Sequence, residues 1–240
     1  MIDESTTTEA GPGRRGWVGV DPDQDGARPL PLSRPRIVRA ALRLVDDRGL
    51  AALTMRALAT ELEVSTMALY NHVKDKDEMV DLMVDLMLGE VDCSEQDGDW
   101  TAQLRALVCS YHRALSAHHH LARVYSARVS IGPHGLRIME RAIGLLLGAG
   151  LQPRDATDAF FSLYTYTVGF HQMGSAQPLS IPLQGGGAGG PRALPIEETP
   201  AIAAVDGHLN GTHQPGRFEY GLDLLLYGLR TKISAPDEVR

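Results

Sequence analysis

The side chains of residues 53–76 have the types and the spacing needed to recognise duplex DNA. Hydroxyl, amide and methyl groups can contact base edges in the major groove, whereas cationic and phenolic groups can contact phosphates. The stretch reads LTMRALATELEVSTMALYNHVKDK, with two short helical patterns on either side of a tight turn. This is the layout of a helix-turn-helix motif. The candidate DNA contacts are Thr54, Arg56, Ser65, Thr66, Met67, Ala68, Tyr70, Asn71, His72 and Lys76.

The second helical pattern of this motif would place its first residues in the major groove. Residues 65–68 are small or apolar, which suits methyl contacts with thymine and single hydrogen bonds from hydroxyls. None of them can form the two-pronged contact of arginine with guanine. We therefore expect Arg56, near the start of the preceding helix, to contact a guanine or a phosphate. The side chains expected at the DNA backbone or at the edge of the site are Tyr70, Asn71, His72 and Lys76.

Other residue patterns could support different chemistry, but their surroundings do not fit it. Gly185, Gly187 and Gly190 match a dinucleotide-binding fingerprint, yet no strand precedes them and Pro191 follows where a helix should begin. The three histidines at 118–120 are adjacent, so on a helix they would point in different directions. We expect a flexible loop and a polar helix end, respectively. An enzyme hypothesis lacks a starting point, because no G-x-S-x-G, H-E-x-x-H or P-loop pattern is present.

Composition and charge favour a helical protein that contacts DNA locally. Aromatic residues make up only 5% of the 240 residues, and Ala, Leu and Val supply most of the hydrophobicity. The formal charge of −7 excludes a general binder of polyanions. Residues 33–76, however, carry eight Lys/Arg and five Asp/Glu, a net charge of +3, so the rest of the chain carries −10. A basic patch on an acidic body fits local contact with phosphates.

The cysteines and the hydropathy pattern predict a cytoplasmic protein. Cys93 and Cys109 form no C-x-x-C motif and suggest no disulfide framework, so a reducing compartment is the simpler interpretation. No run approaches the roughly 18 apolar residues that a membrane span needs. We expect no membrane contact.

The elements that position the motif are predicted to be helices throughout. Residues 1–32 are rich in Gly, Pro, Asp and Thr and are expected to form a disordered arm. A helix should follow Ser33 as N-cap and end at Gly49, and the next two helices should begin at Thr54 and at about Ser65, the latter running to Val73. Asp75 and Glu78 resemble a capping box.

The rest of the chain shows helical periodicity and no strand pattern. A helix with a methionine stripe should follow Asp75, and the nine acidic residues from Asp77 to Asp99, with no basic residue among them, should form a solvated face and a loop. A long helix begins near Trp100. A broken segment covers roughly 118–132, and residues 174–195 are Gly/Pro-rich. Further helices are predicted near 134–149, 154–173, 197–209 and 216–232. The predicted fold class is all-α.

The stretch 33–88 resembles the tetracycline-repressor (TetR) family. The form Tyr70-x-His72-Val73-Lys74-x-Lys76 is closest to the branch that contains the tetracycline repressor, and the last helix fits it too, with Phe218-x-x-Gly221-Leu222. The other matching residues are Ile37, Ala40, Ala41, Leu44, Gly49, Leu53, Thr54, Arg56, Leu58, Ala59, Leu62, Val64, Ser65 and Leu69. One position departs from the pattern, because Glu63 stands where the family usually has glycine in the turn.

The resemblance implies a domain plan and partners. Residues 33–78 would form a three-helix DNA-binding domain, and residues 79–240 a helical domain for effector binding and dimerisation. Homodimers would form through the helices near 154–173 and 216–232 and would bind a pseudo-palindromic double-stranded operator. A small-molecule effector in the C-terminal core would change the spacing of the two DNA-binding domains.

The resemblance also argues against tetracycline with magnesium as the effector. Tyr125 and Met173 stand where the tetracycline repressor has a histidine and a glutamate that organise the metal, and Asp92 replaces a further histidine. No metal or other cofactor is therefore expected, and the effector should be apolar or aromatic. The candidate effector-binding residues are Tyr125, Arg128, Phe160, Tyr164, Phe170 and His171.

Three hypotheses remain from the sequence. The first is a ligand-responsive repressor. The second is a DNA-binding regulator of the same fold that senses no small molecule, or that activates transcription. The third is a helical ligand-binding or enzymatic module in which the helix-turn-helix pattern is only a hairpin within a larger bundle.

Overall fold

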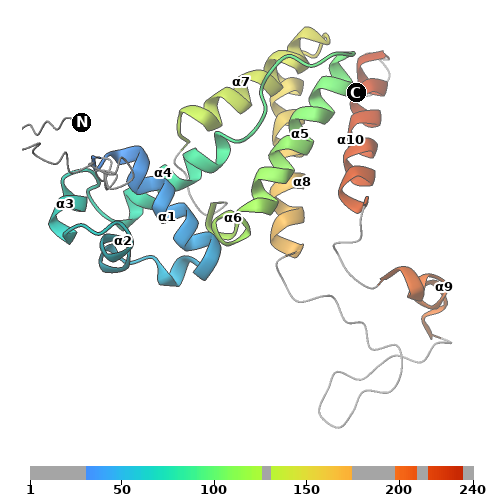
Figure 1. Cartoon of the computed structure of the whole chain (residues 1–240). Helices are drawn as coiled ribbons and strands as arrows, with labels where there is room; N and C mark the ends of the chain where they lie inside the picture. Colours follow the sequence, from blue (N-terminus) through green and yellow to red (C-terminus); the bar gives the residue numbers. More distant parts are fainter. Residues whose placement is uncertain (1–30, 126–130, 175–197, 210–215, 235–240) are drawn as a thin grey trace, which may run out of the picture. The chain divides into compact units, whose positions relative to one another are not determined.

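A computed structural model describes residues 31–125, 131–174, 198–209 and 216–234. Every regular element within these ranges is a helix, so the all-α prediction is confirmed (Figure 1). The predicted arm, apart from residues 31 and 32, the glycine-rich fingerprint and the candidate effector residue Arg128 lie outside the described residues. No helix in the described ranges is long and apolar enough to cross a membrane.

Helix α1 (Arg34–Arg48) packs against several of the helices that follow it along the chain. Its buried side chains lie between Ile37 and Val45, and the helix ends at Gly49, whose φ of 77° is the left-handed conformation that favours glycine. Ser33 does occupy the N-cap with an extended backbone, but its side chain makes no capping hydrogen bond. Pro35 in the first turn supports the start instead, because its fixed φ suits a helix and its missing N–H leaves no donor unpaired.

After the 3-10 turn η2 (Leu50–Ala52), two short helices form the predicted motif. In α2 (Met55–Glu61) the Thr54 hydroxyl accepts a hydrogen bond from Ala57 N–H at 3.0 Å, and in α3 (Thr66–Tyr70) the Ser65 hydroxyl accepts one from Ala68 N–H at 3.2 Å. Helix α3 is shorter than predicted. Val73 lies beyond its end, yet is still buried as expected.

Helix α4 (Lys76–Leu88) connects this motif to the rest of the chain. Asp75 caps it by accepting a hydrogen bond from Glu78 N–H at 2.8 Å. The methionine stripe, Met79, Met83 and Met87, is fully buried and therefore belongs to the core. The helix contacts α1 on one side, and on the other α5 (Trp100–Ala117), α6 (His119–Tyr125) and α7 (Pro133–Gly148).

The remaining helices form a bundle around α5. Helices α7 and α8 (Pro153–Gly174) pack on α5 and on each other, and α10 (Arg217–Ser234) packs on α5 and α8. A further helix, α9, spans Pro200–Leu209. The segment predicted as broken, 118–132, contains α6 in its first half. Helix α6 is held there by buried Leu121 and Ala122, which pack it against its neighbours.

Candidate functional site

The turn between α2 and α3 determines how α3, the second helix of the motif, packs on α2. Leu58 of α2 and Leu69 of α3 are both fully buried, so each short helix is anchored by packing rather than by its own hydrogen bonds. Within the turn, Val64 N–H donates to Ala59 O at 3.0 Å. Glu63 is in the left-handed conformation, with a φ of 56°, and it is the only non-glycine residue with positive φ in the described part of the chain. The departure seen in the sequence therefore carries real backbone strain.

The outer face of α3 is exposed and unusually apolar for a surface. The side chain of Met67 is 72% exposed and that of Tyr70 is 49% exposed. Ser65, Thr66 and Asn71 are also exposed, whereas Ala68 and His72 are half-buried. Large hydrophobic side chains exposed on a short, anchored helix are typical of a surface that binds a partner molecule. All the residues predicted on α3 thus lie on or beside one surface.

Two predicted cations flank this surface. Arg56 in α2 and Lys76 at the start of α4 are exposed, and neither forms an ion pair within the described ranges. Their charge is therefore available to a phosphate. Thr54 uses its hydroxyl oxygen as the cap acceptor of α2, but the hydroxyl hydrogen remains a potential donor.

A second feature is a cavity of about 230 Å³ enclosed by α5, α6, α7 and α8. The described residues of its wall are mostly aliphatic and aromatic, and none of their side chains is charged. The lining residues are Leu107, Val108, Tyr111, Tyr125, Ile131, Gly135, Ile138, Met139, Ala142, Phe160, Phe161, Leu163, Tyr164 and Thr167.

Aromatic rings from three helices meet at this cavity. The ring of Tyr164 in α8 is stacked with that of Tyr111 in α5, with centroids 6.5 Å apart, and meets the ring of Tyr125 edge-on at 6.3 Å. Phe160 stacks on Tyr164 from the same helix at 6.3 Å. Such a wall offers flat faces to a flat ligand.

The phenols of Tyr111 and Tyr125 stay protonated well beyond neutral pH. Burial raises the pKa of Tyr111 well above its ordinary value, with the neighbouring Tyr125 as a smaller cause. Burial is also the main reason that the pKa of Tyr125 is raised. Both hydroxyls can therefore act as hydrogen-bond donors at any physiological pH.

The predicted effector residues divide into two groups. Tyr125, Phe160 and Tyr164 line the cavity. Phe170 and His171 do not, because they lie farther along α8, where the ring of His112 approaches both, at centroid distances of 5.7 and 4.7 Å. The ring of Phe218 stacks on that of His112, with the two centroids 3.8 Å apart. Side chains of α5 and α10 therefore fill the space beside this end of α8.

The positions compared with the tetracycline repressor are dispersed. Tyr125 lies on the cavity, whereas Met173 is 65% exposed near the end of α8. Asp92 is exposed and accepts hydrogen bonds from the backbone N–H and hydroxyl of Ser94, which help to lower its pKa. Across the described ranges, no group of three or more His, Cys, Asp or Glu residues is arranged to hold a metal ion.

A polar contact connects the cavity wall to α4. Asp85 of α4 accepts hydrogen bonds from His134 N–H at 2.9 Å and from the His134 ring at Nδ1, at 2.8 Å. His134 stands in the first turn of α7, whose N-cap is Gly132, a residue with no side chain to cap the helix. A Cβ at Gly132 would overlap the Asp85 carboxylate. Asp85 thus supplies the missing cap from another helix.

A second polar contact joins α1 to the following helices. His118, between α5 and α6, is buried and lies 2.8 Å from Asp46 of α1 through Nδ1 and 3.1 Å from Glu90, just after α4, through Nε2. Helix α1 and the residues after α4 are therefore held to the bundle by polar contacts as well as by packing.

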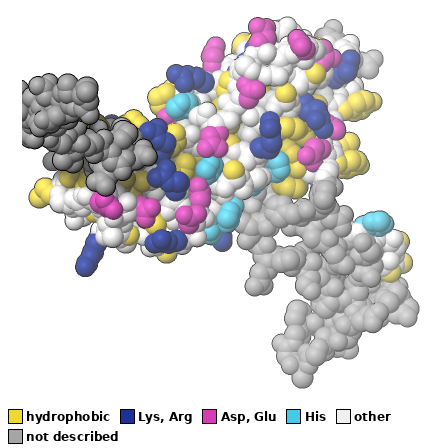
Figure 2. All heavy atoms as spheres, viewed as in Figure 1, with side chains coloured by type: hydrophobic (Ala, Val, Ile, Leu, Met, Phe, Trp, Pro, Cys, Tyr) yellow, Lys and Arg dark blue, Asp and Glu magenta, His cyan; other side chains and the backbone are white. Residues whose placement is uncertain are grey.

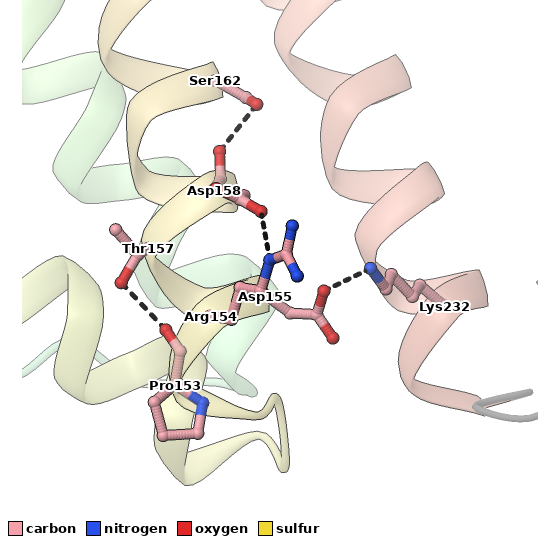
Figure 3. Close-up of polar contacts among 7 residues, drawn as sticks. All are labelled: Pro153, Arg154, Asp155, Thr157, Asp158, Ser162 and Lys232. Atoms are coloured by element: carbon pink, nitrogen blue, oxygen red, sulfur yellow. Dashed lines mark hydrogen bonds and ion pairs between the residues drawn. The ribbon is translucent and has the colours of Figure 1, made fainter. Parts of the chain in front are cut away.

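Helix α10 leaves an apolar face in solvent. The exposed fractions are 69% for Tyr220, 56% for Leu224 and 72% for Tyr227. The three residues of α10 recur at helical spacing, opposite the buried Phe218 and Leu222. Figure 2 shows hydrophobic side chains exposed along the edge where α10 lies. Lys232 of α10 donates to Asp155 of α8 at 2.7 Å, which ties the last turn of α10 to the first turn of α8 (Figure 3).

Comparison with known proteins adds independent findings. The family model for tetracyclin repressor-like C-terminal domains matches residues 93–233, and the model for bacterial regulatory proteins of the tetR family matches residues 37–83. The transcriptional repressor DrrR1 of Streptomyces coeruleorubidus is 32% identical over 182 residues, which span 68% of this chain and 67% of DrrR1.

Two solved structures are similar over most of the chain. Apo ActR from Streptomyces coelicolor is 34% identical with a TM-score of 0.72, covering 85% of this chain and 97% of ActR, and ActR has also been crystallised with actinorhodin. BioQ bound to its natural double-stranded DNA operator is 25% identical with a TM-score of 0.60, covering 84% of this chain and 99% of BioQ.

Proposed function

The chain belongs to the TetR family of bacterial transcriptional regulators, and from this premise we propose that it is a repressor that binds a pseudo-palindromic operator as a homodimer and is released by a small apolar or aromatic effector. The observation that carries the proposal is the exposed outer face of α3, on a helix anchored by buried Leu69. Because its target is DNA, we expect it to act in the cytoplasm.

The α3 face supports recognition of DNA in the major groove. Met67 and Ala68 can contact thymine methyl groups, and Ser65 and Thr66 can exchange single hydrogen bonds with base edges. Exposed Arg56 is positioned for a guanine or a phosphate at the border of this face. The candidate contacts to the backbone are Thr54, Tyr70, Asn71, His72 and Lys76. The similar protein BioQ binds a double-stranded operator, which agrees with this assignment.

The exposed apolar face of α10, which packs on α8, supports dimerisation. Side chains as large as Tyr220, Leu224 and Tyr227 are costly to leave in water along one helix stripe. A two-fold dimer would cover this face on both subunits, and the same axis would relate the α3 helix of one subunit to that of the other. The operator would then have matching half-sites.

The apolar cavity supports an effector that is flat and hydrophobic. Tyr125, Phe160 and Tyr164 provide the aromatic part of its wall, and ActR, which has a similar structure, binds actinorhodin. A ligand that fills the cavity presses on α7 through Ile138 and Met139. Asp85 ties the start of α7 to α4, and α4 packs on α1. Movement of α7 can therefore be transmitted through α4 and α1 to α2 and α3.

A gel-shift assay against the DNA upstream of the protein's own coding sequence, at stated salt concentrations, tests the proposal. Wild-type protein should shift this DNA, and Arg56→Ala and Tyr70→Ala should each weaken binding while the dimer persists. Arg154→Ala is the matched control, because it removes an exposed cation from α8. Unchanged affinity in both test variants would contradict the assignment of the α3 surface. A shift that no hydrophobic compound relieves would favour a regulator without an effector, and a reporter gene would distinguish repression from activation.

A further inference from the structure

Tyr111 has a buried hydroxyl that has no hydrogen-bond partner among the described residues. The side chain is 6% exposed and lines the cavity, yet its Oη neither donates nor accepts a hydrogen bond. Burial is the main cause of its raised pKa and the nearby Tyr125 side chain a smaller one, but no hydrogen bond of ordinary geometry joins the two hydroxyls. Burying a phenol without a partner costs free energy, so such a group is rare unless something else satisfies it.

The surroundings of this hydroxyl limit what could satisfy it. Among the described lining residues, the other polar side chains are those of Tyr125, Tyr164 and Thr167, and the last already donates to Leu163 O at 2.8 Å. A charged ligand would have no opposite charge among the described lining residues, and burying it unpaired would be strongly unfavourable. The described part of the cavity wall therefore favours an uncharged ligand over a charged one.

We propose that the effector is an uncharged, fused-ring aromatic ketone or quinone whose carbonyl oxygen accepts a hydrogen bond from the Tyr111 hydroxyl. The inference rests on the proposed function and names the chemical class of its effector. A carbonyl fits this position because it accepts without adding a hydrogen that would itself need a buried partner. The rings stack on the faces of Phe160 and Tyr164, in the orientation that these two rings already share.

The rim of the cavity is suited to the entry of such a molecule. Phe161 and Ile131 both line the cavity, and each is 52% exposed to solvent. They therefore form an apolar border between the cavity and water. A cavity of about 230 Å³ accommodates a few fused rings.

Equilibrium dialysis of the full-length protein with a matched set of tricyclic probes tests this assignment. 9-Fluorenone carries one carbonyl, and fluorene has the same rings without it. 9-Oxofluorene-2-carboxylate adds a negative charge, whereas 9-aminoacridine is a flat cation. We expect 9-fluorenone to bind wild-type protein more tightly than the other three.

The variant Tyr111→Phe removes the donor and keeps the ring. It should weaken 9-fluorenone binding roughly three- to tenfold, the effect of one net hydrogen bond, and leave fluorene binding unchanged. Tyr166→Phe is the matched control, because it removes a phenol of α8 that lies outside the cavity and donates to Phe218 O at 2.8 Å. It should leave the affinities for both probes unchanged.

Several results would overturn the assignment. These are an absence of 9-fluorenone binding up to its solubility limit, equal affinities for 9-fluorenone and fluorene, an equal loss of both in Tyr111→Phe, or tightest binding by either charged probe. None of these measurements involves DNA. Failure of the proposed regulatory function would instead appear as a missing shift with upstream DNA in the gel-shift assay, whatever the dialysis shows.

Discussion

Replacing Asp85 tests whether the cavity communicates with the reading helices through the contact between α4 and α7. The carboxylate accepts the N–H of His134 at 2.9 Å and contacts the His134 ring at 2.8 Å. Its side chain is only 19% exposed, and Gly132 leaves the space that it occupies. The perturbation is Asp85→Ala, which removes both contacts and leaves the buried methionine face of α4 untouched.

The expected loss of stability follows from these two contacts. Losing a cap acceptor at a helix N-terminus costs about 1 kcal/mol, and the second hydrogen bond contributes about 1 kcal/mol more. A total of about 2 kcal/mol should lower the melting temperature by roughly 4–8 °C in a protein of this size. In a double-mutant cycle with His134→Ala, the double variant should lose about 1 kcal/mol less than the sum of the single variants, because Asp85 and His134 share one of the contacts.

The functional consequence is a loss of coupling. Operator affinity without ligand and ligand affinity without DNA should each change less than threefold in Asp85→Ala, because neither surface contains this residue. The factor by which saturating 9-fluorenone weakens operator binding should fall several-fold. Fluorescence anisotropy with labelled operator, with and without the ligand, measures this factor. Asp158→Asn, which alters an exposed carboxylate of α8 paired with Arg154 at 4.0 Å, should behave as wild type.

Two outcomes would refute this reasoning. Additive effects of Asp85→Ala and His134→Ala on stability would mean that the contact does not exist in solution. An unchanged coupling factor in a folded Asp85→Ala protein would mean that the signal reaches α1 by another route, such as the contact of His118 with Asp46.

Three further predictions follow from single features. Glu63→Gly should raise stability in thermal unfolding by about 0.5–1 kcal/mol. The left-handed conformation costs an L-residue about 1–2 kcal/mol, and the greater entropy of glycine in the unfolded chain offsets part of the gain. A decrease in stability would show that the strain is compensated locally. Leu224→Glu should convert the dimer into folded monomers in sedimentation velocity, and a persistent dimer would place the interface elsewhere. Because burial raises the pKa of Tyr111, the folded protein should be fully stable below about pH 10 and should lose stability as the pH rises further, since the unfolded chain loses the phenolic proton first. In chemical denaturation, the stability of Tyr111→Phe should depend less on pH in this range, and an equal pH dependence would contradict the burial of Tyr111.

The reading helices could be predicted from the sequence because their signals are local. The caps at Thr54 and Asp75 and the glycine at 49 each act within a few residues, and all three occupy the predicted positions. Ser33 shows the limit of such signals, because a capping residue type stands at the N-cap but makes no capping bond. Local chemistry specifies where a helix can begin, and packing decides which of the available contacts form.

The cavity could be predicted only in part because its wall comes from four separate helices. Phe160 and Tyr164 were recognisable as an aromatic face one turn apart on one helix. Phe170 and His171 continue that helix, but no local pattern indicates that His112 and Phe218 fill the space beside them. Tyr111 was missed because it lies in the buried stripe of α5 and looks like an ordinary core residue. Its distinguishing property, a hydroxyl without a partner, exists only in three dimensions.

Asp85 shows how a functional connection can be hidden in a bland pattern. It belongs to the acidic run from Asp77 to Asp99, for which a solvated face was the simplest expectation. A helix that begins Gly132-Pro133-His134 has no capping side chain of its own, so its first N–H groups need an acceptor from elsewhere. That acceptor must be an oxygen on a packed neighbour, and α4 is the acidic helix that packs on α7. The uncapped start of α7 and the additional carboxylate of α4 are each ordinary features on their own. Together they specify the contact through which ligand binding and operator binding can influence each other.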